Sequence, residues 1–337
     1  MTVPPFESAR KHPPLFHTVG SPLTWGLFLF GFFVLLALDL GVFNRKPHRV
    51  SMREALRWSV IWVSLSLAFN GYVYYSFGEE KALEFLSAYL IEEALSVDNI
   101  FVFVVLFRYM RVPPEYLHRV LFAGILGALI LRGVFIGVGL ALIETIRWSL
   151  YVFGALLLFT GLRLLVSGEG GEPGDGKKDN WVKRKAEQWL RVTKEFEGPR
   201  FFIVRDGKRY ATTLFVTLLM VETADVVFAI DSIPAIFGIT TDPFIVFTSN
   251  MCAVMGLRSM FFLLENVIDR FHLLKYGLGL VLSFVGTKMI LGMGLGAWLP
   301  EIHIPIKISL LVVAGLIGGS ILLSLVFPPR PPPAVKR

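Results

Sequence analysis

The chain has 337 residues, of which 54% are hydrophobic and only 18% are charged, and its formal net charge is +7. Soluble domains usually carry about 25% charged residues, so this composition and the apolar runs between Leu23 and Phe327 indicate a polytopic membrane protein. The basic residues lie between apolar runs, which argues against a nucleic-acid partner, and the single cysteine, Cys252, excludes disulfide frameworks and thiolate metal sites.

The apolar runs predict an all-α membrane protein of about nine transmembrane helices, formed by one polytopic domain over residues 1–337. The first run is long enough to span the membrane and is followed by a basic loop, so we expect no cleaved signal peptide. In chain order, the expected spans are 22–43, 58–77, 82–107, 119–143, 147–166, 211–234, 243–264, 272–293 and 305–327.

The distribution of Lys and Arg predicts how these spans are oriented. With the N-terminus outside, most of the 33 basic residues fall in loops on the cytoplasmic side, and the C-terminus is cytoplasmic as well. We therefore expect a multi-pass protein of the bacterial inner or plasma membrane, with the lipid bilayer as a partner and no nucleic acid.

One long cytoplasmic loop is expected over residues 168–210. Within it, residues 181–192 combine aromatic and basic side chains and predict a short amphipathic helix on the anionic inner leaflet, although a solvated linker would explain the same composition. A hairpin is predicted over 201–213, around an Asp206-Gly207 turn. Residues 328–337 are rich in proline and are expected to form a disordered tail.

Two of the spans carry carboxylates in the same pattern. The third span contains IEEALSVDNIFVF and the sixth contains VETADVVFAIDSIP. When Asp98 is aligned with Asp231, Glu92 falls on Asp225, six residues upstream in both segments. A carboxylate at the bilayer centre costs several kcal/mol unless it faces a partner, an ion or water. A chain that carries this cost twice, at matched positions, is expected to handle a cation.

The spans that follow extend the match. The fourth span has Leu131-Arg132 near its centre, and the seventh has Leu257-Arg258. Because the third span runs inward and the sixth runs outward, spans 3–4 and 6–7 are predicted to form an inverted internal repeat. Many secondary transporters are built in this way and bind their substrate near the midplane. Chance similarity between apolar helices is the competing explanation.

The acidic segments offer only oxygen donors, without histidine or cysteine. Such a set suits hard or borderline-hard cations such as Mn²⁺, Mg²⁺ or Ca²⁺, and the carboxylates could also carry protons. A continuous helix would spread them over two faces, and Pro234 is a candidate helix break that could bring them together. The expected metal ligands are Glu92, Asp98, Asn99, Glu222, Asp225, Asp231 and Ser232.

Structural pairing is the main alternative for these acids, because they could simply neutralise Arg132 and Arg258. We expect both arginines to act as counter-ions and scaffold rather than as substrate contacts. Asp39 and Lys288 could form a further pair, or each could reach a membrane interface by snorkelling.

Several runs of the sequence match one known family: Leu90–Glu92, Leu95–Asn99, Val221–Glu222, Asp225–Phe237, Thr240–Val246, Thr248–Asn250, Gly256–Arg258 and Lys275–Leu278. With these runs the chain resembles the TerC/Alx family of integral membrane proteins, which is named for tellurium resistance. The resemblance covers about residues 25–326. It implies a multi-span transporter of the LysE-type superfamily, active in manganese efflux and, in some members, supplying Mn²⁺ to exported enzymes.

The resemblance also implies partners, because some members associate with other membrane or secretion proteins. One residue departs from it: Glu93 stands where Alx-like members often carry lysine, and this adds a negative charge beside the first acidic segment.

The expected function is export of divalent cations, with Mn²⁺ as the main substrate and no tightly bound cofactor, in metal homeostasis or tellurite resistance. One alternative is a non-transporting scaffold that recruits partners for a metal or envelope stress response. Another is a transporter of Ca²⁺, Mg²⁺ or H⁺. An enzyme is the least expected class, because no nucleophile–base pair is found among the buried residues.

Overall fold

The computed structural model describes most of the chain. The described residues are 18–38, 51–146, 148–166, 183–185, 188–193, 196–205, 207–265, 271, 273–293, 302 and 304–327. Asp39, the proline-rich tail and the first part of the long loop lie outside the described residues.

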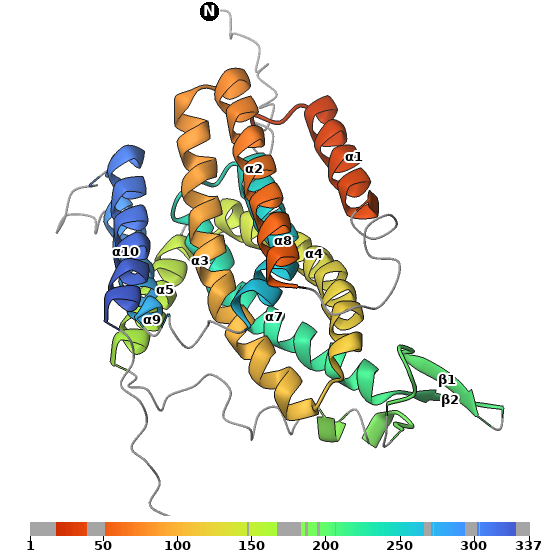
Figure 1. The fold of residues 1–337 in the computed structure, drawn as a ribbon. Coiled ribbons are helices and arrows are strands. Elements are labelled where there is room, and N and C mark those ends of the chain that lie inside the picture. Colours follow the sequence, from red (N-terminus) through yellow and green to blue (C-terminus); the bar gives the residue numbers. More distant parts are fainter. Residues whose placement is uncertain are drawn as a thin grey trace, which may run out of the picture.

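Helices dominate the described part of the chain, as the sequence predicts (Figure 1). Each expected span coincides with one of them. Six helices, α4, α5 and α7 to α10, are long and apolar enough to cross a membrane, whereas the crossing of α1, α2 and α3 stays a prediction. The bounds are α1 Pro22–Leu38, α2 Met52–Phe77, α3 Glu79–Met110, α4 Pro114–Thr145, α5 Ser149–Val166, α7 Thr213–Phe237, α8 Pro243–Leu264, α9 Leu274–Gly292 and α10 Ile306–Val326.

Four helices, α3, α4, α7 and α8, form the centre of the bundle. The N-terminal half of α3 shares a hydrophobic cluster with the C-terminal half of α7, and their other halves share a second cluster, so the two helices are antiparallel. The first turns of α4 pack on the last turns of α8, and this pair is antiparallel as well. An inverted repeat requires these opposite directions, and the repeat itself stays a prediction.

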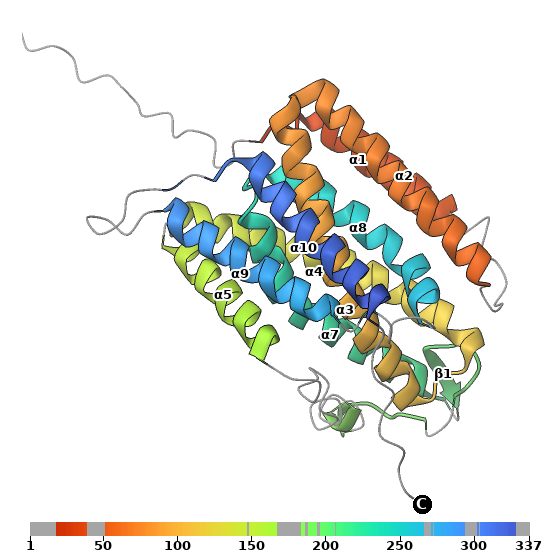
Figure 2. The ribbon, with the colours of Figure 1, turned by 60° about the vertical axis from the view of Figure 1, so that its left-hand side comes forward.

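A third antiparallel pair, α5 and α9, packs through glycines at one side of the bundle, opposite α1 and α2 (Figure 2). A Cβ atom at Gly161 would lie 2.6 Å from the carbonyl oxygen of Gly279, and one at Gly286 would lie 2.6 Å from that of Gly154. Small residues allow this close backbone approach between membrane helices.

The α5–α9 pair extends the sequence match to a third helix of each half. Both helices have two glycines seven residues apart and a basic residue two positions after the second glycine, namely Gly154, Gly161 and Arg163 in α5 and Gly279, Gly286 and Lys288 in α9. This shared spacing would extend the predicted repeat from two spans to three in each half.

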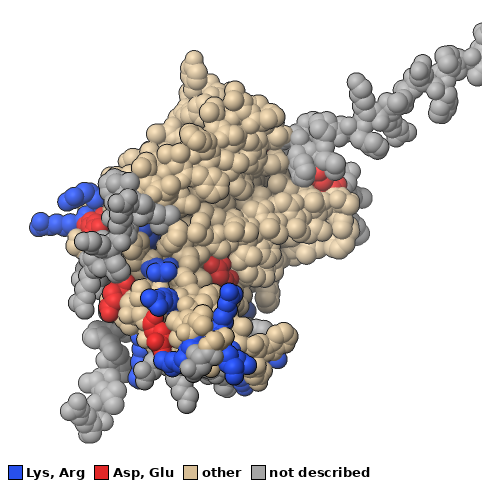
Figure 3. Space-filling model, turned by 90° about the vertical axis from the view of Figure 1, so that its right-hand side faces the viewer, with Lys and Arg blue, Asp and Glu red and all other residues tan. Residues whose placement is uncertain are grey.

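Charged side chains gather at one end of the molecule, below a broad uncharged belt (Figure 3). In this region, strands β1 (Phe202–Arg205) and β2 (Lys208–Ala211) pair antiparallel within the segment where a hairpin is predicted. Arg205, Lys208 and Arg209 of the hairpin are exposed. The hairpin is fixed to the helices by Arg119, whose guanidinium lies 5.6 Å from the centre of the Phe201 ring.

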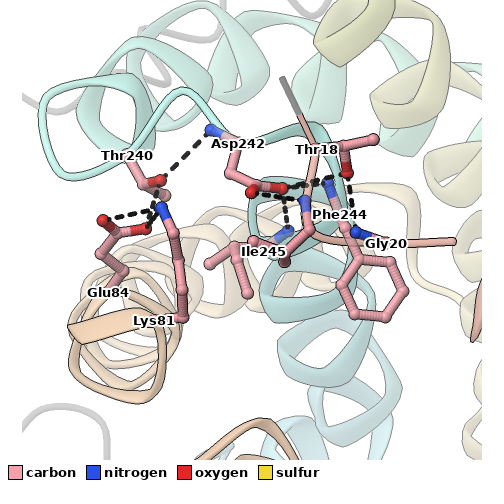
Figure 4. Close-up of polar contacts among 9 residues, drawn as sticks. Thr18, Gly20, Lys81, Glu84, Thr240, Asp242, Phe244 and Ile245 are labelled. Carbon is pink, nitrogen blue, oxygen red and sulfur yellow. Dashed lines mark hydrogen bonds and ion pairs between the residues drawn. The ribbon is translucent and has the colours of Figure 1, made fainter. Parts of the chain in front are cut away.

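Polar contacts at the start of α8 account for the Thr-Thr-Asp-Pro-Phe run (Figure 4). Asp242 is the N-cap of α8, and its carboxylate accepts hydrogen bonds from the backbone N–H groups of Phe244 at 3.0 Å and Val19 at 3.0 Å. The hydroxyl of Thr240 donates to Glu84 of α3 at 2.6 Å. These hydrogen bonds join α3, α8 and residues 18–20, so they give the run a structural role.

The glycine contact between α5 and α9 can be tested by overpacking. We expect Gly161→Leu to lower the free energy of unfolding by about 1–3 kcal/mol or more, because its side chain would meet the backbone of α9. Gly315→Leu in α10 is the control, since its Cβ would contact nothing within 4 Å. Unfolding in mixed micelles measures both variants, and equal effects would contradict close α5–α9 packing.

Candidate functional site

Arg132 of α4 lies at the centre of the bundle with none of its surface exposed. One end of its guanidinium forms an ion pair with Glu92 of α3, which is also fully buried. On the other side, Nη2 and Nε donate to the two carboxylate oxygens of Asp225 of α7, at 3.1 and 3.4 Å. This two-pronged contact is the geometry that arginine offers to a carboxylate.

The two acids at this arginine are the pair that the sequence alignment matched. They come from antiparallel helices and meet at one cation, so each half of the chain contributes one carboxylate. Glu92 and Asp225 thus form the ion pairs with Arg132 that the structural alternative describes, and their role as metal ligands stays a prediction. A buried charge that loses its partner is strongly destabilising, so these three side chains depend on one another.

Glu222 lies on α7, three residues before Asp225 and therefore on nearly the same face. Its carboxylate sits against Gly127 of α4, where a Cβ atom would overlap it. Among the described residues, Oε2 of Glu222 is buried and has no hydrogen-bond partner. The α4–α7 contact thus holds a third carboxylate close to the ion cluster, and a Cβ atom at position 127 would require that carboxylate to move.

A small cavity of about 20 Å³ adjoins this group between α3, α4, α7 and α8. Asp225 is its charged lining residue, and Gly124, Ala128 and Val254 are among the others. A cavity of this size admits one water molecule or a bare ion.

Asp98 and Asp231 lie on opposite sides of Arg132. Each is six residues beyond its matched acid, which is about 9 Å along a helix. Because α3 and α7 are antiparallel, these displacements point in opposite directions. Asp231 accepts a hydrogen bond from Thr160 of α5 at 3.2 Å. Asp98 instead interacts electrostatically with Lys275 of α9.

Asn99 and Ser232, the other two expected ligands, are buried next to these aspartates. Among the described residues, neither the Asn99 Nδ2 atom nor the Ser232 hydroxyl has a hydrogen-bond partner. The same holds for Ser96 of α3 and for both side-chain polar atoms of Asn250 of α8, which the sequence analysis did not single out. An asparagine within an apolar span is itself a signal that could have identified Asn250.

The expected break at Pro234 is wrong. Helix α7 includes Pro234 and continues to Phe237, so its carboxylates keep the spread over two faces that a continuous helix dictates. Pro234 removes one helical hydrogen bond, to the carbonyl of Ile230, and lies in the last turn of α7. Within the described residues, no three His, Cys, Asp or Glu side chains are close enough to hold a metal ion. The seven expected ligands do not form one coordination sphere in this conformation.

The remaining charges lie away from Arg132. Arg258 lines a cavity of about 10 Å³ with Glu54 and His118, so it does not repeat the environment of Arg132. Glu93 accepts a hydrogen bond from the Tyr89 hydroxyl at 2.7 Å. Lys288 interacts electrostatically with Glu84. The expected partner of Lys288, Asp39, lies outside the described residues.

The ion cluster can be tested by comparing unbalanced and balanced substitutions. We expect Arg132→Met to lower the free energy of unfolding by about 3–5 kcal/mol, because it leaves two buried carboxylates without their cation. Adding Glu92→Gln should restore part of this loss, which unfolding in mixed micelles measures. Arg205→Met, which removes a surface pair with Glu197, should cost less than about 1 kcal/mol. Strict additivity of the two core substitutions would contradict the cluster.

Comparison with known proteins places the chain in one family. The profile of the integral membrane protein TerC family matches residues 77–331. Membrane protein STKORF319 of Myxococcus xanthus, which is uncharacterised, is 49% identical over 92% of this chain and 94% of its own length. The proposed membrane-bound redox modulator Alx is 46% identical in Salmonella typhi, over 89% of this chain and 93% of the relative. In Escherichia coli K12, Alx is 44% identical over 89% of this chain and 94% of the relative.

No solved structure matches this chain. The family profile covers most of the helices that surround Arg132, and the relatives match nearly the whole sequence. The chain therefore belongs to the integral membrane protein TerC family.

Proposed function

We propose that this protein is a secondary transporter that exports divalent metal cations, with Mn²⁺ as the main substrate, from the cytoplasm. Its proposed role is in metal homeostasis or tellurite resistance, in the bacterial inner membrane. The supporting observation is the meeting of Glu92 and Asp225, two matched carboxylates from antiparallel helices, at the buried centre of the bundle.

The flanking aspartates support a path through this centre. In the predicted orientation, Asp98 is displaced from Arg132 toward the cytoplasm and Asp231 toward the outside. An ion that moves between them passes Glu92 and Asp225, so each side of the membrane has its own carboxylate before the centre. This order suits a carrier that opens to one side at a time around a central site.

The chemistry of the path favours hard divalent ions. Its side chains are carboxylates, amides and hydroxyls, which are the ligands that Mn²⁺, Mg²⁺ and Ca²⁺ prefer. The carboxylates could exchange protons for the metal, so proton-coupled export is chemically available. The relatives' designation as redox modulators does not suggest a thiol switch here, because Cys252 is the only cysteine of the chain.

A non-transporting scaffold is the alternative, and the exposed basic hairpin is the observation in its favour. Purified protein in liposomes separates the two functions, since a scaffold moves no Mn²⁺ by itself.

The role of the flanking aspartates is tested in the same liposomes. We expect Asp98→Asn and Asp231→Asn each to reduce Mn²⁺ flux at least tenfold, because each removes the carboxylate proposed to flank the centre on one side of the membrane. Glu79→Gln removes an acid from an exposed pair with Lys307 and should leave the flux unchanged. Wild-type flux in either aspartate variant would exclude that residue from the path. Competition with Ca²⁺, Mg²⁺ or a pH gradient then identifies the preferred ion.

Glycine substitutions on α4 test the role of Glu222 without touching any charge. A Cβ at Gly127 overlaps the Glu222 carboxylate, so we expect Gly127→Ala to displace that side chain and reduce Mn²⁺ flux several-fold. Gly137→Ala lies on the same helix and meets nothing within 4 Å, so it should keep the wild-type flux. If the two variants transport equally well, Glu222 has no part in the path.

A further inference from the structure

We propose that the guanidinium of Arg132 occupies the cation site itself in this conformation, as a tethered competitor that the substrate must displace from Asp225. This inference rests on the proposed transport function and adds to it a mechanism of gating. Arg132 is thereby a positioning residue of the transport cycle, and not only a structural counter-ion.

The formal charges of Arg132 and its neighbouring carboxylates match one divalent cation. Arg132, Glu92, Asp225 and the nearby Glu222 together carry a formal charge of about −2, if each group has its usual ionisation. One divalent cation neutralises this group, whereas a monovalent cation leaves it negative. Buried charges are tolerated where they are paired, so the group is suited to accept one divalent ion.

The contact that opens in this exchange is the one between Arg132 and Asp225. The two hydrogen bonds from Arg132 to Asp225, at 3.1 and 3.4 Å, are longer than the roughly 2.7–2.9 Å of strong charge-assisted bonds. Release of Asp225 would leave Arg132 paired with Glu92. Asp225 and Glu222, three residues apart on α7, could then share the arriving ion.

Asp225 borders a cavity that could receive the entering ion. The cavity of about 20 Å³ that Asp225 lines lies between α3, α4, α7 and α8. The Glu222 carboxylate packs on Gly127 of α4 and does not line this cavity. The unpartnered oxygen of Glu222 gives an entering cation a first ligand before it competes for Asp225. The exchange therefore breaks two hydrogen bonds from arginine and forms metal–oxygen bonds, while the backbone of α7 stays in place.

Binding of Mn²⁺ to the purified full-length protein tests this exchange. Free Mn²⁺ is followed by its electron paramagnetic resonance signal, which broadens on binding. We expect Arg132→Gln to bind Mn²⁺ at least tenfold more tightly than wild type, because the competing cation is gone. Arg132→Gln should also release Mn²⁺ slowly, so that its flux in liposomes falls. Equal or weaker binding in Arg132→Gln would overturn the proposal.

Two further variants show whether the gain is local. Arg258→Gln removes one buried positive charge from α8, away from Asp225, and its Mn²⁺ affinity should stay within twofold of wild type. The double variant Arg132→Gln/Glu222→Gln should lose most of the gain. An equal gain in Arg258→Gln would show a general effect of net charge and contradict the tethered competitor.

The melting temperature gives a second measure, which can be taken even if Arg132→Gln is poorly stable before Mn²⁺ is added. Mn²⁺ should raise the melting temperature of Arg132→Gln more than that of wild type, since the ion replaces the lost charge. If Arg132→Gln does not fold even with Mn²⁺, Arg132→Lys takes its place. Its single ammonium cannot bridge both carboxylates as a guanidinium does, so we expect a gain in affinity of about threefold. An unchanged affinity in Arg132→Lys would overturn the proposal.

The outcomes also separate this inference from the transport function. Wild-type protein that moves Mn²⁺ in liposomes, together with an Arg132→Gln variant of unchanged affinity, leaves the transporter standing and removes the tethered competitor. Wild-type protein that neither binds nor moves any divalent cation removes both.

Discussion

The arrangement of the central helices depends on one buried ion cluster, in which Arg132 of α4 joins Glu92 of α3 to Asp225 of α7. All three are buried, so loss of one leaves an uncompensated charge on the others. Apolar side chains of similar size are often as stable as such a cluster or more so. Stability alone therefore does not account for these charges, and the proposed handling of a cation would.

The sequence predicts the helices of this fold well, because the length of an apolar run and the placement of basic loops are local properties. It predicts packing less well. The glycine contacts of α5 and α9 require two helices that are more than a hundred residues apart to meet, and periodicity within either helix does not reveal this. Pro234 shows a related limit, because the effect of a proline depends on how far the helix continues beyond it.

Of the seven predicted ligands, Glu92 and Asp225 meet at Arg132, and the sequence did not distinguish this arginine from Arg258. The alignment of Glu92 with Asp225 identified the two carboxylates that meet, but Arg132 and Arg258 share the same Leu-Arg context and could not be told apart. Only tertiary packing shows that Arg132 takes both acids while Arg258 lines another cavity. Glu93 makes the same point: it adjoins Glu92 in sequence, yet the helical turn of about 100° directs it to Tyr89.

This asymmetry bears on how a two-fold repeat could work as a directional carrier. If two inverted halves were identical, the states open to either side would have equal energy, and neither would be the resting state. Here one arginine serves the acids of both halves, and Glu222 has no carboxylate at its matched position in α3, where Tyr89 stands. The acid that α7 adds next to Asp225 therefore has no counterpart at Arg132 in α3, where the extra acid Glu93 contacts Tyr89 instead. A cation that binds there stabilises one arrangement of the halves more than the other, which is what coupling between binding and opening requires.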